Sequence, residues 1–258
     1  MNNLEKFNGI IQNAKTQDYL KKVLNEKSSE FVNNITAIVG GNEKLQQCEP
    51  MSLLYAGIKA TALDLPIDPN LGFAYIIPYG QKAQFQLGYK GLKQLAIRTG
   101  QYQRINTTDV RSGEILGVNR MTGDVDFRWI DSDKERNATK VVGYLSYFRL
   151  NNGFENTLYM TIEEIENHGK KYSKTYNNGV WKTDFDKMAV KTVTKLNLSR
   201  SGIMSVKLQD GIKFDQSVIT EEQEAEYIDN EDAKSFDPES DISANDKTLK
   251  LISDEAEK

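Results

Sequence analysis

The last 45 residues of this 258-residue chain differ in kind from those before them, and the difference limits which part can fold. Residues 214–258 carry 15 Asp and Glu against 4 Lys and Arg, a net charge of −11. Residues 1–213 carry 22 acidic and 29 basic residues, a net charge of +7. The final segment has few large apolar side chains, so their burial cannot offset the entropy lost on ordering it. We therefore predict a basic folded body over residues 1–213 and an acidic, mostly disordered C-terminal tail over residues 214–258.

The end of this tail leaves two interpretations open. Leu249, Leu251 and Ile252 lie among charged residues in the segment 247–258, which could fold against a partner. The alternative is a solubilising tail that has no partner.

The composition of the whole chain excludes several classes of protein. No apolar run approaches the roughly 20 residues that span a bilayer, and no basic stretch followed by an apolar one marks the chain for secretion. We therefore expect a cytoplasmic protein without membrane contact. Cys48 and His168 are the single residues of their types, so we expect no disulfide and no zinc site. We interpret Cys48 as an inert buried thiol.

Apolar residues at helical spacing predict helices in the first third of the body. Residues 1–47 are interpreted as short N-terminal helices. Pro50 suits the first turn of a further helix, and apolar residues then recur on one face from Met51 to Ala62, before Pro66 ends the pattern. This pattern is typical of a core helix.

The pattern changes to strict alternation after Gly72, which predicts a β-hairpin over residues 73–89 with Pro78 at a strand end or edge. Helical spacing returns from Lys90 to Thr99, and Gly100 stands where a left-handed cap is expected. Segments rich in β-branched and aromatic residues predict four further strands. They are residues 102–110, 124–130, 140–150 and 154–161.

Turn and cap motifs complete the prediction. Asn151-Asn152-Gly153 separates the last two strands and favours a hairpin turn. Thr161 to Glu164 matches a capping box, and Thr183 to Asp186 resembles one with Asp in place of the usual Glu or Gln. The chain is therefore predicted to be α+β, with a β-hairpin and a small antiparallel sheet packed against helices.

The segment from Gly169 to Arg200 combines many cations with interleaved aromatic residues. Lys187, Lys191 and Lys195 are spaced by four, so on a helix they form one row of like charge. Such a row can track phosphates, and aromatic faces can stack on bases. The alternative is that these lysines only solubilise the helix and that Trp181 and Phe185 belong to the core; for Phe185 we favour the core.

A second cationic group surrounds the junction between the hairpin and the following helix, so we expect two basic surfaces to form the walls of one groove. The candidate DNA-binding residues are Tyr89, Lys90, Lys93, Arg98, Arg104, Lys170, Lys171, Lys174, Trp181, Lys182, Lys187, Lys191, Lys195 and Arg200.

Catalytic motifs are missing from the sequence. There is no Gly-x-x-x-x-Gly-Lys-Ser/Thr loop for nucleotide hydrolysis, and His168 has no assignable nucleophile beside it. Acids at Asp124, Asp126, Asp131 and Asp133 could gather a divalent metal, although they occupy charge-rich connections where exposed acids are common. We therefore expect no catalytic residue, no metal site and no cofactor, with a metal-dependent nuclease as a weak alternative.

Several motifs occur together in a defined order along the chain. They are Cys48-Glu-Pro-Met-Ser-Leu-Leu-Tyr-Ala56, Leu63-Asp-Leu-Pro-Ile-Asp-Pro69, Gly72-Phe-Ala-Tyr-Ile-Ile-Pro-Tyr-Gly80, Phe85-Gln-Leu-Gly-Tyr-Lys-Gly-Leu92, Ala96-Ile-Arg-Thr-Gly100, and Trp181 with Lys187-Met-Ala-Val-Lys-Thr192. In their residues, order and spacing these motifs resemble the RecT family of phage and prophage recombinases. The resemblance covers roughly residues 48–200.

The resemblance implies ATP-independent annealing of complementary single strands by an annealing-recombinase-like core that assembles into rings or helical filaments. It implies a basic groove lined by Tyr89, Lys90, Lys93, Arg98 and the late-helix lysines, and it supports Lys170, Lys171 and Lys174 much less. The implied partners are single-stranded DNA, the annealed duplex, a cognate 5′→3′ exonuclease and the host single-stranded-DNA-binding protein, in a bacterial cell. Mg²⁺ would act only by non-specific screening. The alternative binding function is a module that coats single strands without annealing them.

Overall fold

The computed structural model describes residues 3–119, 121–220, 222 and 224–227, which divide between two units. The first unit comprises residues 3–95 and 206–227, and the second comprises residues 96–205. Residues 3–213, within the folded body predicted over residues 1–213, thus contribute to both units. An apolar pattern shows which residues are buried but not which of them pack together. The α+β class is confirmed, because helices combine with small antiparallel sheets.

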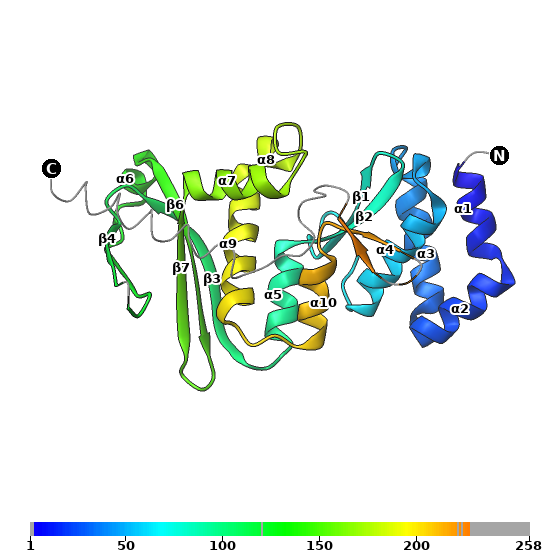
Figure 1. Ribbon diagram of the computed structural model, residues 1–258, viewed down its shortest axis with the longest axis horizontal. Helices are drawn as coiled ribbons and strands as arrows, with labels where there is room; N and C mark the ends of the chain where they lie inside the picture. The colour runs from blue at the N-terminus through cyan, green and yellow to red at the C-terminus, as the bar shows by residue number, and fades with distance from the viewer. Residues whose placement is uncertain (1–2, 120, 221, 223, 228–258) are drawn as a thin grey trace. The chain divides into compact units, whose positions relative to one another are not determined.

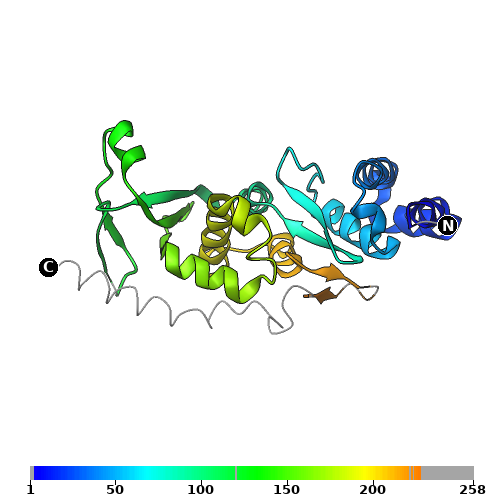
Figure 2. The same cartoon turned by 90° about the horizontal axis from the view of Figure 1, so that it is seen from above.

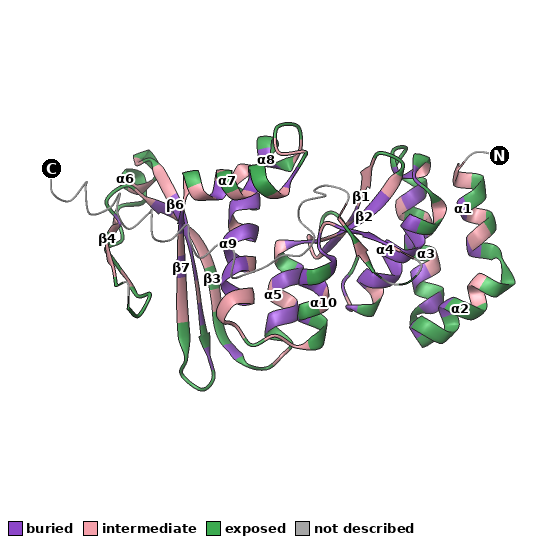
Figure 3. Cartoon of the chain, viewed as in Figure 1, coloured by how far each residue is buried: buried purple, intermediate pink, exposed green. Residues whose placement is uncertain are grey.

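Helices make up most of the first unit (Figure 1). They are α1 (Asn3–Gln12), α2 (Ala14–Leu24), η1 (Asn25–Lys27), α3 (Ser28–Gly40), η2 (Leu45–Gln47), α4 (Pro50–Ala62), α5 (Tyr89–Ile97) and α10 (Val206–Phe214). Pro50 occupies the first turn of α4, as predicted. Every residue from Ser52 to Ala60 is buried, since α1, α3 and strand β2 all pack against α4. In Figure 3 the buried residues accordingly run along this helix.

The predicted hairpin is present as β1 (Ala74–Tyr79) and β2 (Lys82–Leu87). Gly80 adopts a φ of +57° in the turn, and Pro78 lies opposite Ala83 near the strand end. The free edge of β2 is covered by the chain after α10, because the Phe85 N–H donates to the Ser217 carbonyl at 2.9 Å. Two short strands follow there, β8 (Val218–Ile219) and β9 (Ala225–Glu226).

The predicted boundary between body and tail is too early. Phe214 ends α10, and Asp215, Val218 and Ile219 are buried against the hairpin. The Asp215 carboxylate accepts a hydrogen bond from the Leu87 N–H at 2.9 Å. The prediction used the average composition of residues 214–258, which is strongly acidic, and an average does not show a few buried apolar side chains at one end of the segment. Residues 228–258, which contain Leu249, Leu251 and Ile252, lie outside the described residues.

The second unit is built on a three-stranded antiparallel sheet in the order β3-β6-β7. Its elements are β3 (Tyr102–Arg111), β4 (Ile115–Val118), β5 (Val125–Phe127), α6 (Asp133–Ala138), β6 (Val141–Leu150), β7 (Glu155–Thr161), α7 (Ile162–Tyr172), α8 (Val180–Thr183) and α9 (Phe185–Ser201). The Asn151-Asn152-Gly153 turn joins β6 and β7 with Gly153 at a φ of +89°, as predicted. The strand predicted over 124–130 is shorter and pairs with β4 rather than with the sheet.

Helix α9 crosses one face of this sheet, and α7 packs beside it (Figure 2). The Asn197 amide donates to the Ser146 carbonyl at 2.9 Å, and the Thr194 and Thr107 hydroxyls are 2.7 Å apart. The capping box of Thr161 and Glu164 opens α7, as predicted. The second predicted box is wrong, because Asp184 rather than Thr183 caps α9.

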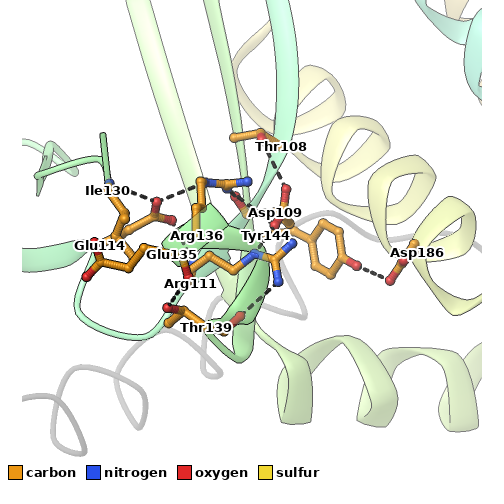
Figure 4. Close-up of polar contacts among 10 residues, drawn as sticks. All are labelled: Thr108, Asp109, Arg111, Glu114, Ile130, Glu135, Arg136, Thr139, Tyr144 and Asp186. Atoms are coloured by element: carbon orange, nitrogen blue, oxygen red, sulfur yellow. Dashed lines mark hydrogen bonds and ion pairs between the residues drawn. The ribbon is translucent and has the colours of Figure 1, made fainter. Parts of the chain in front are cut away.

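A buried ionic network anchors the β4–β5 excursion and α6 to the sheet (Figure 4). The side chain of Glu114, which is fully buried, accepts hydrogen bonds from the Arg111 N–H at 2.7 Å and the Arg136 Nε at 3.0 Å. Asp109 pairs with Arg111 at 2.6 Å and Arg136 at 3.3 Å. Burial would raise the pKa of Asp109, but these two guanidinium groups outweigh it and hold the pKa below its usual value.

Candidate nucleic-acid interface

The junction between the hairpin and α5 is shaped by two glycines that leave no room for a side chain. A Cβ on Gly88 would lie 2.1 Å from the Gly72 carbonyl oxygen, and one on Gly91 would lie 2.1 Å from the Phe73 carbonyl oxygen. The Gly88 N–H donates to the same Phe73 carbonyl at 2.9 Å. The first turn of α5 is therefore pressed against the residues that precede β1. This contact explains both glycines of the Gly-Tyr-Lys-Gly motif and fixes the two residues between them.

Those two residues, with Lys93 one turn later, form the basic group of the first unit. Lys90 is exposed, whereas Tyr89 and Lys93 are half-buried. The Lys93 ammonium lies 5.5 Å from the centroid of the Tyr89 ring, a cation–π contact. No carboxylate among the described residues forms an ion pair with Lys90. Its charge is therefore available to an anionic ligand.

The other members of the predicted junction group belong to the second unit. Arg98 and Arg104 are exposed, and Arg104 lies on β3. The sequence therefore grouped residues that the fold assigns to separate units. That the two basic surfaces form the walls of one groove stays a prediction.

The segment from the end of α7 through α8 carries four of the seven exposed lysines that the structure describes in the second unit. Its exposed lysines are Lys170, Lys171, Lys174 and Lys182. The Lys171 ammonium lies 4.8 Å from the Tyr172 ring centroid, and Lys170 pairs with Glu166 at 3.2 Å, four residues before it. We define these four lysines as the α7–α8 basic surface. Lys182 forms no ion pair with any described carboxylate. Its charge, like that of Lys90 in the first unit, is therefore available to an anionic ligand.

Trp181 does not offer a ring face to a base. Its side chain is only 6% exposed and belongs to the apolar core between the sheet, α7 and α9. Its ring lies 5.6 Å from that of Tyr176 and 5.9 Å from that of Phe185. Gly169 permits this packing, because a Cβ there would lie 2.8 Å from the Tyr176 ring. The expectation that Phe185 packs on the core is confirmed, and the stacking role predicted for Trp181 does not fit its position.

The lysines of α9 do not form an exposed row. Lys187 has an 80% exposed side chain and pairs with the Asp184 cap, whereas Lys191 is only 7% exposed. Lys195 and Arg200 are half-buried. A spacing of four places side chains on one face of an isolated helix. In this fold α9 is enclosed on most of its circumference, as the run of buried residues in Figure 3 shows. Replacing all three lysines would therefore disturb packing as well as charge.

The groups considered for catalysis do not assemble into a site. Among the described residues no three His, Cys, Asp or Glu side chains are placed to hold a metal ion. Asp124, Asp126, Asp131 and Asp133 are all exposed. Cys48 is fully buried, as predicted, and burial together with the charge of Glu49 raises the pKa of its thiol.

The part of the chain that matches a known family contains the motifs described above. Residues 29–238 match the RecT family. The chain belongs to the RecT family. It is 41% identical to the uncharacterized protein YqaK of Bacillus subtilis strain 168 over 251 residues, which cover 96% of this chain and 84% of that protein. It is 29% identical to the protein RecT of Escherichia coli strain K12 over 180 residues, 67% of this chain and 65% of that protein.

Membership of the RecT family assigns the chain to recombination proteins of the single-strand annealing type, rather than to classical enzymes. The family match begins near α3 and includes the α5 junction, the sheet and the α7–α8 basic surface. In the described part of the chain, no helix has the length and apolar character needed to cross a bilayer.

Proposed function

We propose that this RecT-family chain binds single-stranded DNA through Lys90 and the α7–α8 basic surface, and anneals complementary strands without nucleotide hydrolysis. The observation that carries the proposal is the gathering of exposed lysines around α8 in a member of an annealing family. Lysine ammonium groups bind phosphates as point charges without reading base sequence. Such binding suits a protein that must accept any strand.

In the proposed reaction the protein holds phosphates and leaves bases free to pair. Each base-pair step then releases about 1.4 kcal/mol of stacking free energy, so no hydrolysis is required. Neighbouring protomers would extend the site along the strand. Complementarity is tested by base pairing itself, and Mg²⁺ would contribute only diffuse screening of the two strands.

Mixing two complementary oligonucleotides with the protein tests this function directly. We expect the duplex to form faster than in a protein-free control, with no ATP or other nucleotide present. Fluorescence quenching between labels on the two strands measures the rate. A rate equal to that of the control, from protein that binds the strands, would leave strand coating as the function. Shortening of the labelled strands in Mg²⁺ would indicate the nuclease alternative instead.

Replacing Lys90 and Lys182 by glutamine tests the interface residues. If each contacts one phosphate, the slope of log affinity against log salt should fall by about 1.4, since each single-strand phosphate contributes about 0.7. Fluorescence anisotropy of a labelled oligonucleotide at several salt concentrations measures this slope. The matched control is Lys15→Gln with Lys134→Gln, which removes one exposed lysine from each unit away from the proposed interface. Equal slopes in the two double variants would remove Lys90 and Lys182 from the interface.

We further propose that the protein acts as a homo-oligomer, in ring or filament form, in the cytoplasm of a bacterial host. Its proposed partners are a cognate 5′→3′ exonuclease, which supplies single strands, and the host single-stranded-DNA-binding protein. Electron micrographs with and without complementary strands would decide between rings and filaments.

A further inference from the structure

The β3-β6-β7 sheet has a second face, opposite the one that α9 covers. The side chains of Thr107 and Ser146, which are cross-strand partners, form hydrogen bonds with Thr194 and Asn197 of α9 and therefore define one face. Side chains alternate along a strand, so the next paired residues point to the opposite face. These include the pair of Asn106 and Tyr147.

On this opposite face Arg104 of β3 lies directly across from Arg149 of β6. Both arginines are exposed, and neither guanidinium group forms an ion pair or a hydrogen bond with any side chain that the structure describes. Like charges placed directly opposite each other in a sheet destabilise it. Glu155 of β7 is the cross-strand partner of Arg149, but its carboxylate accepts the Tyr147 hydroxyl at 2.6 Å. Arg104 and Arg149 are thus cross-strand neighbours of like charge, and Glu155 supplies one carboxylate beside Arg149.

The surroundings of this pair are polar, include the Glu155 carboxylate, and contain the aromatic ring of Tyr147. Tyr147 lies one position further along the same face and is half-buried, and Thr157 of β7 is its cross-strand partner. Toward the other end of the sheet the same face is closed, because Leu145 and Val110 are buried. We define Arg104, Asn106, Tyr147, Arg149 and Thr157 as the arginine patch.

We infer that the arginine patch binds the phosphates of a DNA strand, with a base against the ring of Tyr147. A guanidinium fork matches phosphate oxygens in a bidentate geometry, and an anion between Arg104 and Arg149 would relieve their repulsion. Stacking on a tyrosine ring accepts any base. The sheet separates this patch from α9, so it is a DNA contact distinct from the one proposed at α8. The inference rests on the proposed function only in taking single-stranded DNA as the ligand.

The variant Arg104→Gln with Arg149→Gln tests this contact. We expect the affinity for a fluorescein-labelled oligothymidine, measured by anisotropy, to fall about tenfold at low salt and the salt slope to fall by about 1.4. The melting temperature should change little, because the variant removes the like-charge pair of Arg104 and Arg149 together with the opposite-charge pair of Arg149 and Glu155. The control is Lys134→Gln with Lys140→Gln, which removes two exposed charges from the same unit. Its smaller effect on affinity would show that position, rather than net charge, decides binding.

The outcomes separate this inference from the proposed function. A folded arginine variant whose affinity and salt slope match those of the lysine control would overturn the inference, even if the wild type anneals strands. A wild type that binds oligothymidine but does not anneal would overturn the annealing function and leave the arginine result to stand. A second variant, Tyr147→Ala, should weaken binding without changing the salt slope, since it removes stacking and no charge. An unchanged affinity in that variant would remove the ring from the contact.

Discussion

Replacing Glu114 by alanine is expected to lower the free energy of unfolding by about 3–5 kcal/mol, the cost of removing one partner from a buried ion pair. The Glu114 side chain is fully buried and accepts from two backbone N–H groups, those of Arg111 and Ile130, as well as from Arg136. Its loss would leave all three donors without this acceptor (Figure 4). Thermal or urea unfolding, followed by circular dichroism, measures the change.

Glu135→Ala is the matched control for this prediction. Glu135 is exposed and lies one residue before Arg136, on the same short helix. Surface substitutions of this kind change stability by about 0.5 kcal/mol or less. If Glu114→Ala lowered the free energy of unfolding no more than Glu135→Ala, the ionic network would not anchor the β4–β5 excursion to the sheet.

Replacing Gly91 by alanine is expected to destabilise the first unit by about 3 kcal/mol or more, because the new methyl group overpacks a backbone contact that cannot yield. The added Cβ would lie 2.1 Å from the Phe73 carbonyl oxygen and 3.1 Å from the Leu87 side chain. The first turn of α5 would have to move away from β1, which would displace Lys90. Unfolding experiments and oligonucleotide binding should both report the change.

Gly9→Ala makes the same chemical change but is expected to stabilise the protein. Gly9 lies within α1, and a Cβ there meets nothing within 4 Å. Alanine in an open helical position stabilises by about 0.5–1 kcal/mol relative to glycine. A Gly91→Ala protein as stable as the wild type would show that α5 does not depend on its close approach to Phe73.

Much of the local structure could be predicted because it depends on residues close together in the chain. The capping box at Thr161, the Asn151-Asn152-Gly153 turn and the Pro50 helix start all lie where expected. Each depends on a hydrogen bond or a backbone preference within a few residues. The cap at Asp184 was missed because Thr183 and Asp184 are both acceptable caps, and only the end of α8 decides between them.

The exposure of the candidate interface residues was predicted less well, because exposure depends on distant packing. Lys187 and Lys191 are both lysines of one helix, yet one is exposed and the other buried. Arg149 and Tyr147 were not selected, since their strand is mainly apolar and carries no basic cluster. Only the register between β3 and β6 places Arg104 beside Arg149. The alternation of side chains along one strand does not identify such a pair, because it does not show which residues of the neighbouring strand lie opposite.

By itself the sequence determined that the basic and acidic residues are segregated, that the fold mixes helices with antiparallel strands, and that the motifs are those of the RecT family. These properties follow from composition, short-range periodicity and residue order. Tertiary structure alone decided that residues 214–219 join the first unit, that Trp181 belongs to the core, and that two arginines share an open sheet face. The physical reason is that burial and charge pairing are set by contacts between distant segments. The segregation of charge along the chain therefore favours an anionic ligand for the basic body, whereas packing decides which of its cations are exposed.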